Sequence, residues 1–504
     1  MTKRERKTYK PQAMKTNPWK LLEKYPGPIV EALAALSREK SSPCYIAGGT
    51  IRDWFMGVES QDLDITVGRD SFGWAGALAR KLGGTFVPMD VEEDVARVVW
   101  QEICVDFSSF REGAKSIEED LFKRDFTINS MAVQFPTQIP ASWDSVEPPE
   151  ILDPGDGQKD LQDKIIRSTS AAVFVSDPLR ILRAYRFMAK FGLRIEPYTE
   201  KQIREHIHLL YLAAAERIVF ELDAIMAVPD AIETIEAMHD NAVLEELIPE
   251  LYMGLGVKQP SSHHLDVFGH GIAALKHMET VQKDPGAYFP GQGELFREYL
   301  QRDRRRILLK WAALFHDLGK PETHAIREDR NGRITFYNHD KEGARIFDII
   351  AARFKWRRDD RDFVSRLISI HMWPFHLNNA RKKTGLTPRA YLRLIKTTGE
   401  EYPGLFMLAM ADSLAGCGAG KPPGMEEDIA NLFYEVETVY RETIRPVLTK
   451  RLLTGNDLIA VFGLAPGPAF REIFDCLESA QVEGKVQDKD QALLWVKNYL
   501  KLHK

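Results

Sequence analysis

The chain has 504 residues, which is too long for one ordinary domain, so about three domains are expected. Its 44% hydrophobic content supplies several apolar cores, and 28% charged residues with a net charge of −5 exclude the charge excess typical of disordered chains. No stretch approaches the roughly 18 continuous apolar residues of a membrane span, and the basic N-terminus lacks the apolar core of a secretory signal. The four cysteines show neither CxxC spacing nor a disulfide framework. We therefore expect a cytoplasmic protein with no membrane contact.

Basic residues dominate the first twenty positions, where Glu5 is the single acidic residue, and they recur at 304–306, 355–358 and 381–383. Each such run is more often a solvated surface than a nucleic-acid contact. A negative total charge does not exclude an RNA-binding protein, because an enzyme acting on RNA concentrates acid at its metal site and base along the RNA. The local pattern of charges, and not the total charge, therefore indicates whether the chain binds RNA.

Helical and strand-like patterns alternate between residues 28 and 135. The apolar spacing predicts helices over 28–38, 50–56 and 71–82 and strands over 44–47, 62–67, 85–89, 95–100 and 103–109. This order is typical of a small α/β or α+β domain with a mixed sheet, and we favour the α+β class. From Asp177 onward the helical period dominates, with a first helix that begins at Asp177-Pro178 and ends at Gly192. A sheet domain followed by a long, all-helical body is expected.

The most informative stretch combines a diglycine with two acidic residues on the next strand. Asp62 and Asp64 are two positions apart, so their side chains point to the same face of the strand. Mg²⁺ prefers one or two carboxylates together with substrate phosphate oxygens. Gly48 and Gly49 allow close approach of the backbone, the following helix offers N–H groups to a triphosphate, and Arg52 can add a charge-assisted contact. Either motif alone is usually a turn or a solvated surface, but their order favours a metal–nucleotide site.

This pattern resembles the polymerase-β-like nucleotidyltransferases and, within them, the bacterial class II tRNA nucleotidyltransferase (CCA-adding enzyme) and poly(A) polymerase family. Residues 118–130 (EEDLFKRDFTINS) closely resemble the family signature RRDFTINA, with Lys123 in place of the first arginine. Lysine keeps the charge but lacks the bidentate fork of arginine. The resemblance implies that Asp106 is a third carboxylate of the metal site, that Arg124 contacts phosphate or base, and that Asp125 senses the ribose hydroxyl.

Arginines 180, 183 and 186 lie three positions apart on the helix that follows Asp177, so they share a face. Without further context such a face is usually solvated. The resemblance implies that Asp177 and Arg180 pair with the base edge of incoming CTP or ATP and that Arg183 steadies the nucleotide. It also implies transfer of CMP, with AMP as a second candidate, to the 3′ end of tRNA with Mg²⁺ and release of pyrophosphate.

The segment before the RDFTIN motif is short, because residues 110–115 run almost directly into Ser116. Family members that complete the whole CCA end usually carry a sizeable loop there. By the same resemblance, a short loop is associated with enzymes that add CC but not the final A. CC-only addition is therefore our hypothesis, and an A-adding enzyme or a poly(A) polymerase remains an alternative.

A second set of residues follows the order H…HD…H…H…D and resembles the HD phosphohydrolase superfamily. A lone buried histidine is usually a satisfied core residue, but an ordered series favours metal binding. Imidazole and carboxylate groups suit a divalent transition metal or Mg²⁺. Hydrolysis of phosphoesters such as cyclic phosphate ends and a structural or regulatory role both stay open. The resemblance implies a first-metal set of His270, His316, Asp317 and Asp412, with His339 and His371 completing or flanking the site.

The expected organisation has five parts. They are a basic tail (1–27), a nucleotidyltransferase head (28–175), a helical nucleotide-recognition neck (176–255), an HD metal domain (256–420) and a C-terminal helical tRNA-binding segment (421–504). An alternative of a different class is an HD phosphohydrolase whose N-terminal domain merely binds RNA or nucleotide. The intact DxD and RDFTIN motifs argue against it. The sequence gives no indication of oligomeric state.

Overall fold

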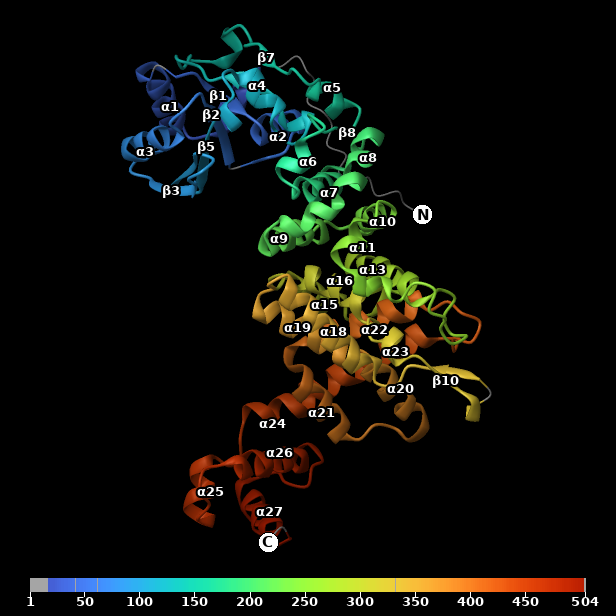
Figure 1. Cartoon of the computed structure of the whole chain (residues 1–504). Helices are drawn as coiled ribbons and strands as arrows, with labels where there is room; N and C mark the ends of the chain where they lie inside the picture. Colours follow the sequence, from blue (N-terminus) through green and yellow to red (C-terminus); the bar gives the residue numbers. More distant parts are fainter. Residues whose placement is uncertain (1–16, 41, 61, 331, 503–504) are drawn as a thin grey trace. The chain divides into compact units, whose positions relative to one another are not determined.

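The computed structural model describes residues 17–502 except 41, 61 and 331 (Figure 1). They form two compact units, one running to Val228 and including 233–247, the other comprising 229–232 and the chain from Ile248 onward. No described helix is long and apolar enough to cross a membrane.

The first unit is built on a seven-stranded sheet of order β3-β4-β5-β2-β1-β6-β7, in which β2 and β5 pair in parallel. The other pairings of this sheet are antiparallel, so it is mixed, as predicted. A separate parallel pair joins β8 to β9. The strands are β1 (Cys44–Ala47), β2 (Asp62–Val67), β3 (Thr85–Asp90), β4 (Val95–Trp100), β5 (Ile103–Ser109), β6 (Ala132–Gln134), β7 (Ile151–Leu152), β8 (Ile165–Ile166) and β9 (Arg194–Ile195).

The rest of the first unit is mainly helical, and α3 packs against the sheet. The α-helices are α1 (Gly27–Glu39), α2 (Gly49–Met56), α3 (Ser71–Leu82), α4 (Ile117–Phe122), α5 (Gly157–Gln162), α6 (Val173–Ser176), α7 (Arg180–Phe191), α8 (Pro197–His206), α9 (Ala215–Met226), α10 (Ile232–Asp240) and α11 (Val243–Leu247). The 3-10 helices are η1 (Pro18–Lys24), η2 (Arg111–Gly113), η3 (Thr127–Asn129), η4 (Trp143–Ser145) and η5 (Ile207–Leu212). Gly192, in the left-handed conformation, ends α7 as expected.

The expected basic tail falls into two parts. Residues 1–16 lie outside the described residues. From residue 17 the chain packs onto the head, because η1 buries Leu21 and Leu22 and the ring of Trp19 contacts that of Trp143 at 5.9 Å. The Tyr25 hydroxyl donates to the backbone oxygen of Asp62 at 2.8 Å. This segment therefore supports the start of strand β2.

The second unit is helical apart from the short hairpin of β10 (Ala325–Arg327) and β11 (Arg333–Thr335). Its α-helices are α12 (Pro249–Tyr252), α13 (Val267–Lys283), α14 (Pro285–Tyr288), α15 (Gly293–Gln301), α16 (Arg305–Phe315), α17 (Lys320–Thr323), α18 (His339–Arg353), α19 (Arg358–Ile370), α20 (Trp373–Thr384), α21 (Pro388–Thr398), α22 (Tyr402–Ala415), α23 (Met425–Val439), α24 (Arg445–Thr449), α25 (Gly455–Phe462), α26 (Pro468–Val482) and α27 (Lys489–Leu502). Its short helical turns are η6 (Glu328–Arg330), η7 (Gly399–Glu401) and the π-helical η8 (Tyr440–Ile444).

Helix α22 is the centre of this unit, since nearly all of its residues are buried. A helix that is apolar on every side is stable only when neighbours cover it completely. Helices α13, α16 and α23 pack against it. The ring of Phe433 in α23 lies 5.2 Å from that of Phe406 in α22, so α23 belongs to the core around α22 although it lies beyond residue 420.

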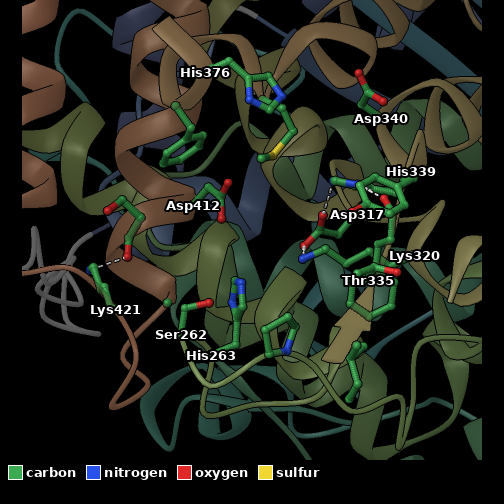
Figure 2. A pocket seen from close by; sticks show the side chains of 18 of the residues that line it. Ser262, His263, Asp317, Lys320, Thr335, His339, Asp340, His376, Asp412 and Lys421 are labelled. Carbon is green, nitrogen blue, oxygen red and sulfur yellow. Dashed lines mark hydrogen bonds and ion pairs between the residues drawn. The ribbon is translucent and has the colours of Figure 1, made fainter. Parts of the chain in front are cut away.

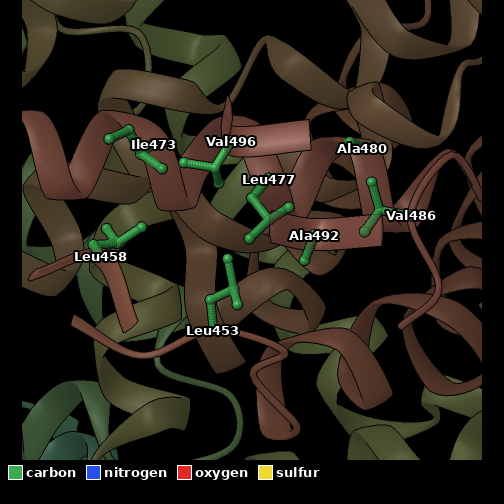
Figure 3. Close-up of a cluster of buried hydrophobic side chains, with 8 residues drawn as sticks. All are labelled: Leu453, Leu458, Ile473, Leu477, Ala480, Val486, Ala492 and Val496. Atoms are coloured by element: carbon green, nitrogen blue, oxygen red, sulfur yellow. The ribbon is translucent and has the colours of Figure 1, made fainter. Parts of the chain in front are cut away.

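The last three helices have a core of their own (Figure 3). It consists of eight buried apolar residues, Leu453, Leu458, Ile473, Leu477, Ala480, Val486, Ala492 and Val496. Helix α25 begins with a capping box, in which Thr454 and Asp457 satisfy each other's backbone N–H groups. Thr454 is thus the N-cap of α25 and Asp457 its N3 residue.

A buried ion pair next to α16 supports a stability prediction. Lys310 donates to Glu279 at 2.8 Å, with 3% and 5% of their side chains exposed, and Glu279 also accepts from the backbone N–H of Ala231. Lys310→Met leaves this carboxylate buried without its counter-ion, so we expect the free energy of unfolding to fall by about 3–5 kcal/mol. Urea unfolding measures the change. Arg297→Met, which removes an exposed ion pair with Glu294, is the control. It should lower the free energy of unfolding by less than about 1 kcal/mol. Equal losses in the two variants would contradict the prediction.

Candidate active site and metal centre

Three carboxylates lie on one face of the head sheet. Asp64 and Asp106 are directly opposite each other in the parallel pairing of β2 with β5. Asp62 lies two residues before Asp64 on the same face, as the spacing predicted. Burial and the neighbouring carboxylate of Asp106 raise the pKa of Asp64 above its ordinary value. Three acids at this spacing form a site that favours a bound cation.

Backbone and hydroxyl donors of helix α2 hold Asp64 in place. Its Oδ2 accepts from the Thr50 N–H at 3.0 Å and from Thr50 Oγ1 at 3.3 Å. We had expected the N–H groups at the start of α2 to be available for a triphosphate. The Thr50 N–H instead fixes a carboxylate, because the helix begins directly beneath Asp64.

The two glycines are required by what surrounds them. Gly48 has φ of +75°, which side chains rarely adopt, and a Cβ there would lie 2.6 Å from an Arg124 nitrogen. A Cβ on Gly49 would lie 2.8 Å from Asp64 Oδ2. The diglycine therefore makes room for one buried arginine and one candidate metal ligand.

Gly49→Ala is expected to lower the rate of catalysis in this site by roughly 100-fold, because displacing a reacting group by about 1 Å has that effect. The new methyl group must push the carboxylate of Asp64 aside. Single-turnover kinetics would measure the change. Gly27→Ala is the control, since nothing lies within 4 Å of a Cβ there. An unchanged rate in Gly49→Ala would show that Asp64 tolerates displacement.

The carboxylates face a cavity of about 870 Å³. Gly49, Arg52, Asp62, Asp64 and Asp106 all contribute to its wall. So do two basic residues that sequence reasoning missed, Lys24 and Lys190. The cavity wall thus carries both acidic and basic residues, the combination expected for a metal-bound triphosphate.

A chain of hydrogen bonds leads from this cavity to helix α7. Arg52 donates to Asn129 Oδ1 at 2.5 Å, and Asn129 donates to Asp125 Oδ1 at 2.8 Å. Asp125 Oδ2 accepts from Arg183 Nε at 2.9 Å and from its Nη2 at 2.6 Å. Against the effect of burial, the Arg183 guanidinium holds the pKa of Asp125 well below its usual range. Asn129 is a further residue of the chain, and its position within the RDFTIN motif was the signal for it.

Arg52 and Arg124 are both buried. The guanidinium of Arg52 also donates to Asp53 at 2.7 Å and lies 5.0 Å and 4.8 Å from the ring centres of Phe187 and Phe191. Arg124 donates to buried Asp120 at 3.0 Å and to Thr66 Oγ1 at 2.8 Å. Both guanidiniums therefore bind side chains inside the head. Arg52 also contributes to the cavity wall.

The expected base-recognition pair lies at the start of α7 and is already engaged. Asp177 forms an ion pair with Arg217 at 3.0 Å. Arg180 donates to Ser176 Oγ at 3.1 Å and to the Val173 carbonyl at 3.4 Å. Neither residue is among those that form the wall of the carboxylate cavity. Arg183, further along α7, is linked through Asp125 and Asn129 to Arg52 in the cavity wall.

All six residues expected at the HD centre converge in the second unit. Two groups of three have ligand atoms within 4.8 Å of one another, His270, His316 and Asp412 in the first and Asp317, His339 and His371 in the second. Asp317 lies between them, with Oδ2 at 3.1 Å from His316 Nε2 and Oδ1 at 3.4 Å from His339 Nε2. Each group contains both imidazole and carboxylate, the donor set of divalent metals.

The hydrogen bonds around the histidines favour metal binding. The Nδ1 atoms of His316, His339 and His371 bond to the carbonyls of Ala313, Phe336 and Ile368 at 2.9, 2.7 and 2.7 Å. A carbonyl can only accept, so each Nδ1 carries a proton and each Nε2 is the atom left to bind a metal ion. Against the effect of burial, the carboxylates of Asp317 and Asp412 raise the pKa of His316 to about 10, so a metal ion there replaces a proton on Nε2.

Unsatisfied atoms point to the same conclusion. His316 Nε2 and Asp317 Oδ1 are buried without a hydrogen-bond partner, as expected for atoms that a metal ion satisfies, whereas Asp317 Oδ2 is paired with Lys320. Burial also lowers the pKa of His371 to about 3, which keeps its ring neutral. These residues therefore fit a metal ion.

The HD centre opens into a cavity of about 680 Å³ (Figure 2). Lys320 lies beside Asp317, with Nζ 2.6 Å from Oδ2, and Lys421 and His376 also contribute to the wall. Phe336 and Trp373 add aromatic surface. A cavity with metal ligands, cationic groups and aromatic rings suits a small phosphoester or a nucleotide.

Comparison with known proteins gives a consistent picture. Three family models match in order: the Poly A polymerase head domain over 44–167, the "Probable RNA and SrmB- binding site of polymerase A" over 192–253, and the HD domain over 267–396. The "A-adding tRNA nucleotidyltransferase" of Deinococcus radiodurans is 31% identical, over 90% of this chain and 95% of its own length. The "CC-adding tRNA nucleotidyltransferase" of Geobacter sulfurreducens is 28% identical, over 94% and 96%.

Solved structures share the fold. The CCA-adding enzyme of Thermotoga maritima complexed with tRNA aligns with a TM-score of 0.60 at 20% identity, over 96% of this chain and 99% of that one. A CCA-adding enzyme in complex with CTP gives a TM-score of 0.61 at the same identity and coverage. The matching head, RNA-binding and HD regions, together with the full-length similarity at 31% identity, place this chain in the family of tRNA nucleotidyltransferases.

Proposed function

We propose that the first unit adds nucleotides from CTP or ATP to the 3′ end of tRNA and releases pyrophosphate. The observation that carries this proposal is the group of three carboxylates on one face of the sheet. Asp64 and Asp106 lie opposite each other on β2 and β5, and Asp62 is on the same face of β2. Transfer to an RNA end is the chemistry that such a site performs in this family. We propose the cytoplasm as its location, because tRNA is the proposed substrate.

The carboxylates are proposed as ligands of Mg²⁺. Magnesium ions bound there would supply positive charge that activates the RNA 3′-hydroxyl and neutralises the phosphates during in-line displacement. Asp62 and Asp64 orient the reacting groups, and Thr50 keeps Asp64 fixed. Lys24 and Lys190 at the cavity wall offer charge to the triphosphate. The chain needs no covalent nucleophile, because positioning and electrostatics carry the rate.

Helix α7 is proposed to select the nucleotide. Asp177 and Arg180 would exchange their present partners, Arg217 and Ser176, for the base edge. Arg183 would steady the nucleotide while it holds Asp125, the proposed sensor of the ribose hydroxyl. The Arg52–Asn129–Asp125–Arg183 chain supports this proposal, because it joins the phosphate end of the site to the helix that reads the base.

We further propose that the enzyme adds one kind of nucleotide only. The short loop before α4 is held at several points: Arg111 N–H donates to Asp120 at 2.9 Å, Lys123 donates to the Glu112 carbonyl at 2.6 Å, and Lys115 N–H donates to Glu119 at 2.8 Å. A loop held in this way has little freedom to reshape the site between C and A. CC addition is the first candidate because the loop is short. A addition is the second, favoured by the 31% identity with the A-adding relative.

Four tRNA transcripts, lacking CCA or ending in C, CC or CCA, distinguish these candidates. Each is incubated with labelled CTP, labelled ATP or both, and the products are resolved to single nucleotides. A CC-adding enzyme extends the first two with CTP and stops at CC. An A-adding enzyme extends only the CC-ending transcript, with ATP. Completion of CCA from the first transcript would overturn the single-nucleotide proposal.

We also propose a divalent transition metal and phosphoester hydrolysis at the HD centre. The orphaned ligand atoms of His316 and Asp317 and the cationic cavity beside them support it. Metal analysis of the purified protein and hydrolysis of a nucleoside 2′,3′-cyclic phosphate with added Mn²⁺, Ni²⁺ or Mg²⁺ test it. A metal-bound protein without hydrolysis would favour the structural or regulatory alternative.

A further inference from the structure

Asp106, the third carboxylate of the head, is held by an arginine from the neighbouring strand. Arg97 on β4 lies directly opposite Asp106 in the antiparallel pairing of β4 with β5. Its Nε donates to Asp106 Oδ1 and its Nη2 to Oδ2, both at 2.7 Å. This is a bidentate fork, the strongest and most directional contact between these two groups. Both oxygens of Asp106 are therefore engaged by one guanidinium.

This contact sets Asp106 apart from Asp64. Asp64 is hydrogen-bonded by the neutral donors of Thr50, and the guanidiniums of Arg124 and Arg52 act on it only through their charge. The charge of Asp106 is balanced, and the pairing raises the pKa of Arg97. A metal ion that uses Asp106 binds an oxygen that Arg97 already engages, and the positive charge of the guanidinium opposes the cation there.

The Arg97–Asp106 pair is accessible enough for a metal ion to displace one of its hydrogen bonds. The side chains of Arg97 and Asp106 are 33% and 27% exposed, whereas those of Arg124 and Asp120 are 8% and 0% exposed. Breaking a partly exposed pair costs less than breaking a buried one. Arg97 can thus yield one oxygen while its other donor keeps Asp106 in position.

We propose that Arg97 is a positioning residue that competes with divalent cations for Asp106. It holds the carboxylate oriented in the nucleotide-free site and weakens metal binding there. The metal that arrives with the triphosphate displaces one of its two hydrogen bonds, so metal binding at Asp106 becomes coupled to nucleotide binding. This inference rests on the proposed role of Asp106 as a metal ligand.

Mn²⁺ binding without nucleotide, followed by electron paramagnetic resonance, tests the proposal. We compare the full-length chain with Arg97→Met, Asp106→Asn and the double variant; sites in the second unit are common to all four. Arg97→Met should bind Mn²⁺ in the head about tenfold more tightly, since one opposing positive charge is removed. The double variant should bind no more tightly than Asp106→Asn. Unchanged or weaker binding in Arg97→Met would overturn the proposal.

Kinetics separate this role from a merely structural one. Arg97→Met should lower kcat, because Asp106 loses its orientation, and should also lower the Mg²⁺ concentration that gives half-maximal rate. Loss of structure would lower kcat without improving Mg²⁺ dependence. Arg97→Lys, which keeps the charge but not the fork, should keep the wild-type Mg²⁺ dependence and lose part of kcat.

Arg80→Met, at the exposed end of α3, is the matched control and should change neither quantity. Failure of the proposed function is a different result: the wild-type protein would then extend none of the tRNA transcripts. The Mn²⁺ measurement needs no turnover, so it reports on Arg97 in either case.

Discussion

Asp64→Asn is expected to lower the rate of nucleotide addition by roughly 10³-fold, equivalent to about 4 kcal/mol of transition-state stabilisation. The amide keeps the size of the carboxylate but removes the charge that faces Asp106 across β2 and β5. It also presents a donor group to a cation. Single-turnover incorporation of labelled CTP or ATP into a matching tRNA transcript measures the loss.

The control for Asp64→Asn is Asp163→Asn, which removes an exposed carboxylate of the same unit. It should keep the wild-type rate within about twofold, as is usual for surface substitutions. Hydrolysis at the HD centre should be unaffected by either change. A rate for Asp64→Asn within tenfold of wild type would show that this carboxylate is not a metal ligand.

Asp317→Asn is expected to lower metal affinity at the HD centre by more than about 100-fold, because substitutions of outer partners alone cost 10–100-fold. Asp317 belongs to the second ligand group and lies within 3.5 Å of His270 and 3.1 Å of His316 in the first. Elemental analysis after dialysis should show the loss of bound transition metal. Any phosphoester hydrolysis should disappear with it, and nucleotide addition should continue.

Asp340→Asn is the matched control for that experiment. Asp340 lies in the wall of the same cavity (Figure 2), but it is outside both ligand groups. Its substitution should leave the metal content unchanged. Equal metal loss in the two variants, or full retention in Asp317→Asn, would contradict the assignment of Asp317 as a shared ligand.

Local sequence patterns were sufficient to predict the elements that carry the candidate active site. Strand β2 and the Gly48–Gly49 turn lie where expected, because alternation of apolar side chains and glycine placement are local properties. The HD series was equally informative, since residues at the ends of α16 and α19 and within α22 must converge if the helices pack around one core.

Contacts across strands could not be predicted in the same way. The pairing of Arg97 with Asp106 depends on the register of β4 against β5, and a shift by one residue would turn Arg97 to the other face. The packing of Arg52 on Phe187 and Phe191 depends on where α7 docks. The role of Tyr25 was hidden because the basic residues before it suggested a tail.

Diffraction from crystals of the protein with Mn²⁺ and a non-hydrolysable CTP or ATP analogue tests the central claim most directly. The account predicts anomalous density between the carboxylates of Asp62 and Asp64, with the triphosphate beside Gly49 in the same cavity. Nucleotide bound elsewhere, with no metal density at these two carboxylates, would contradict it.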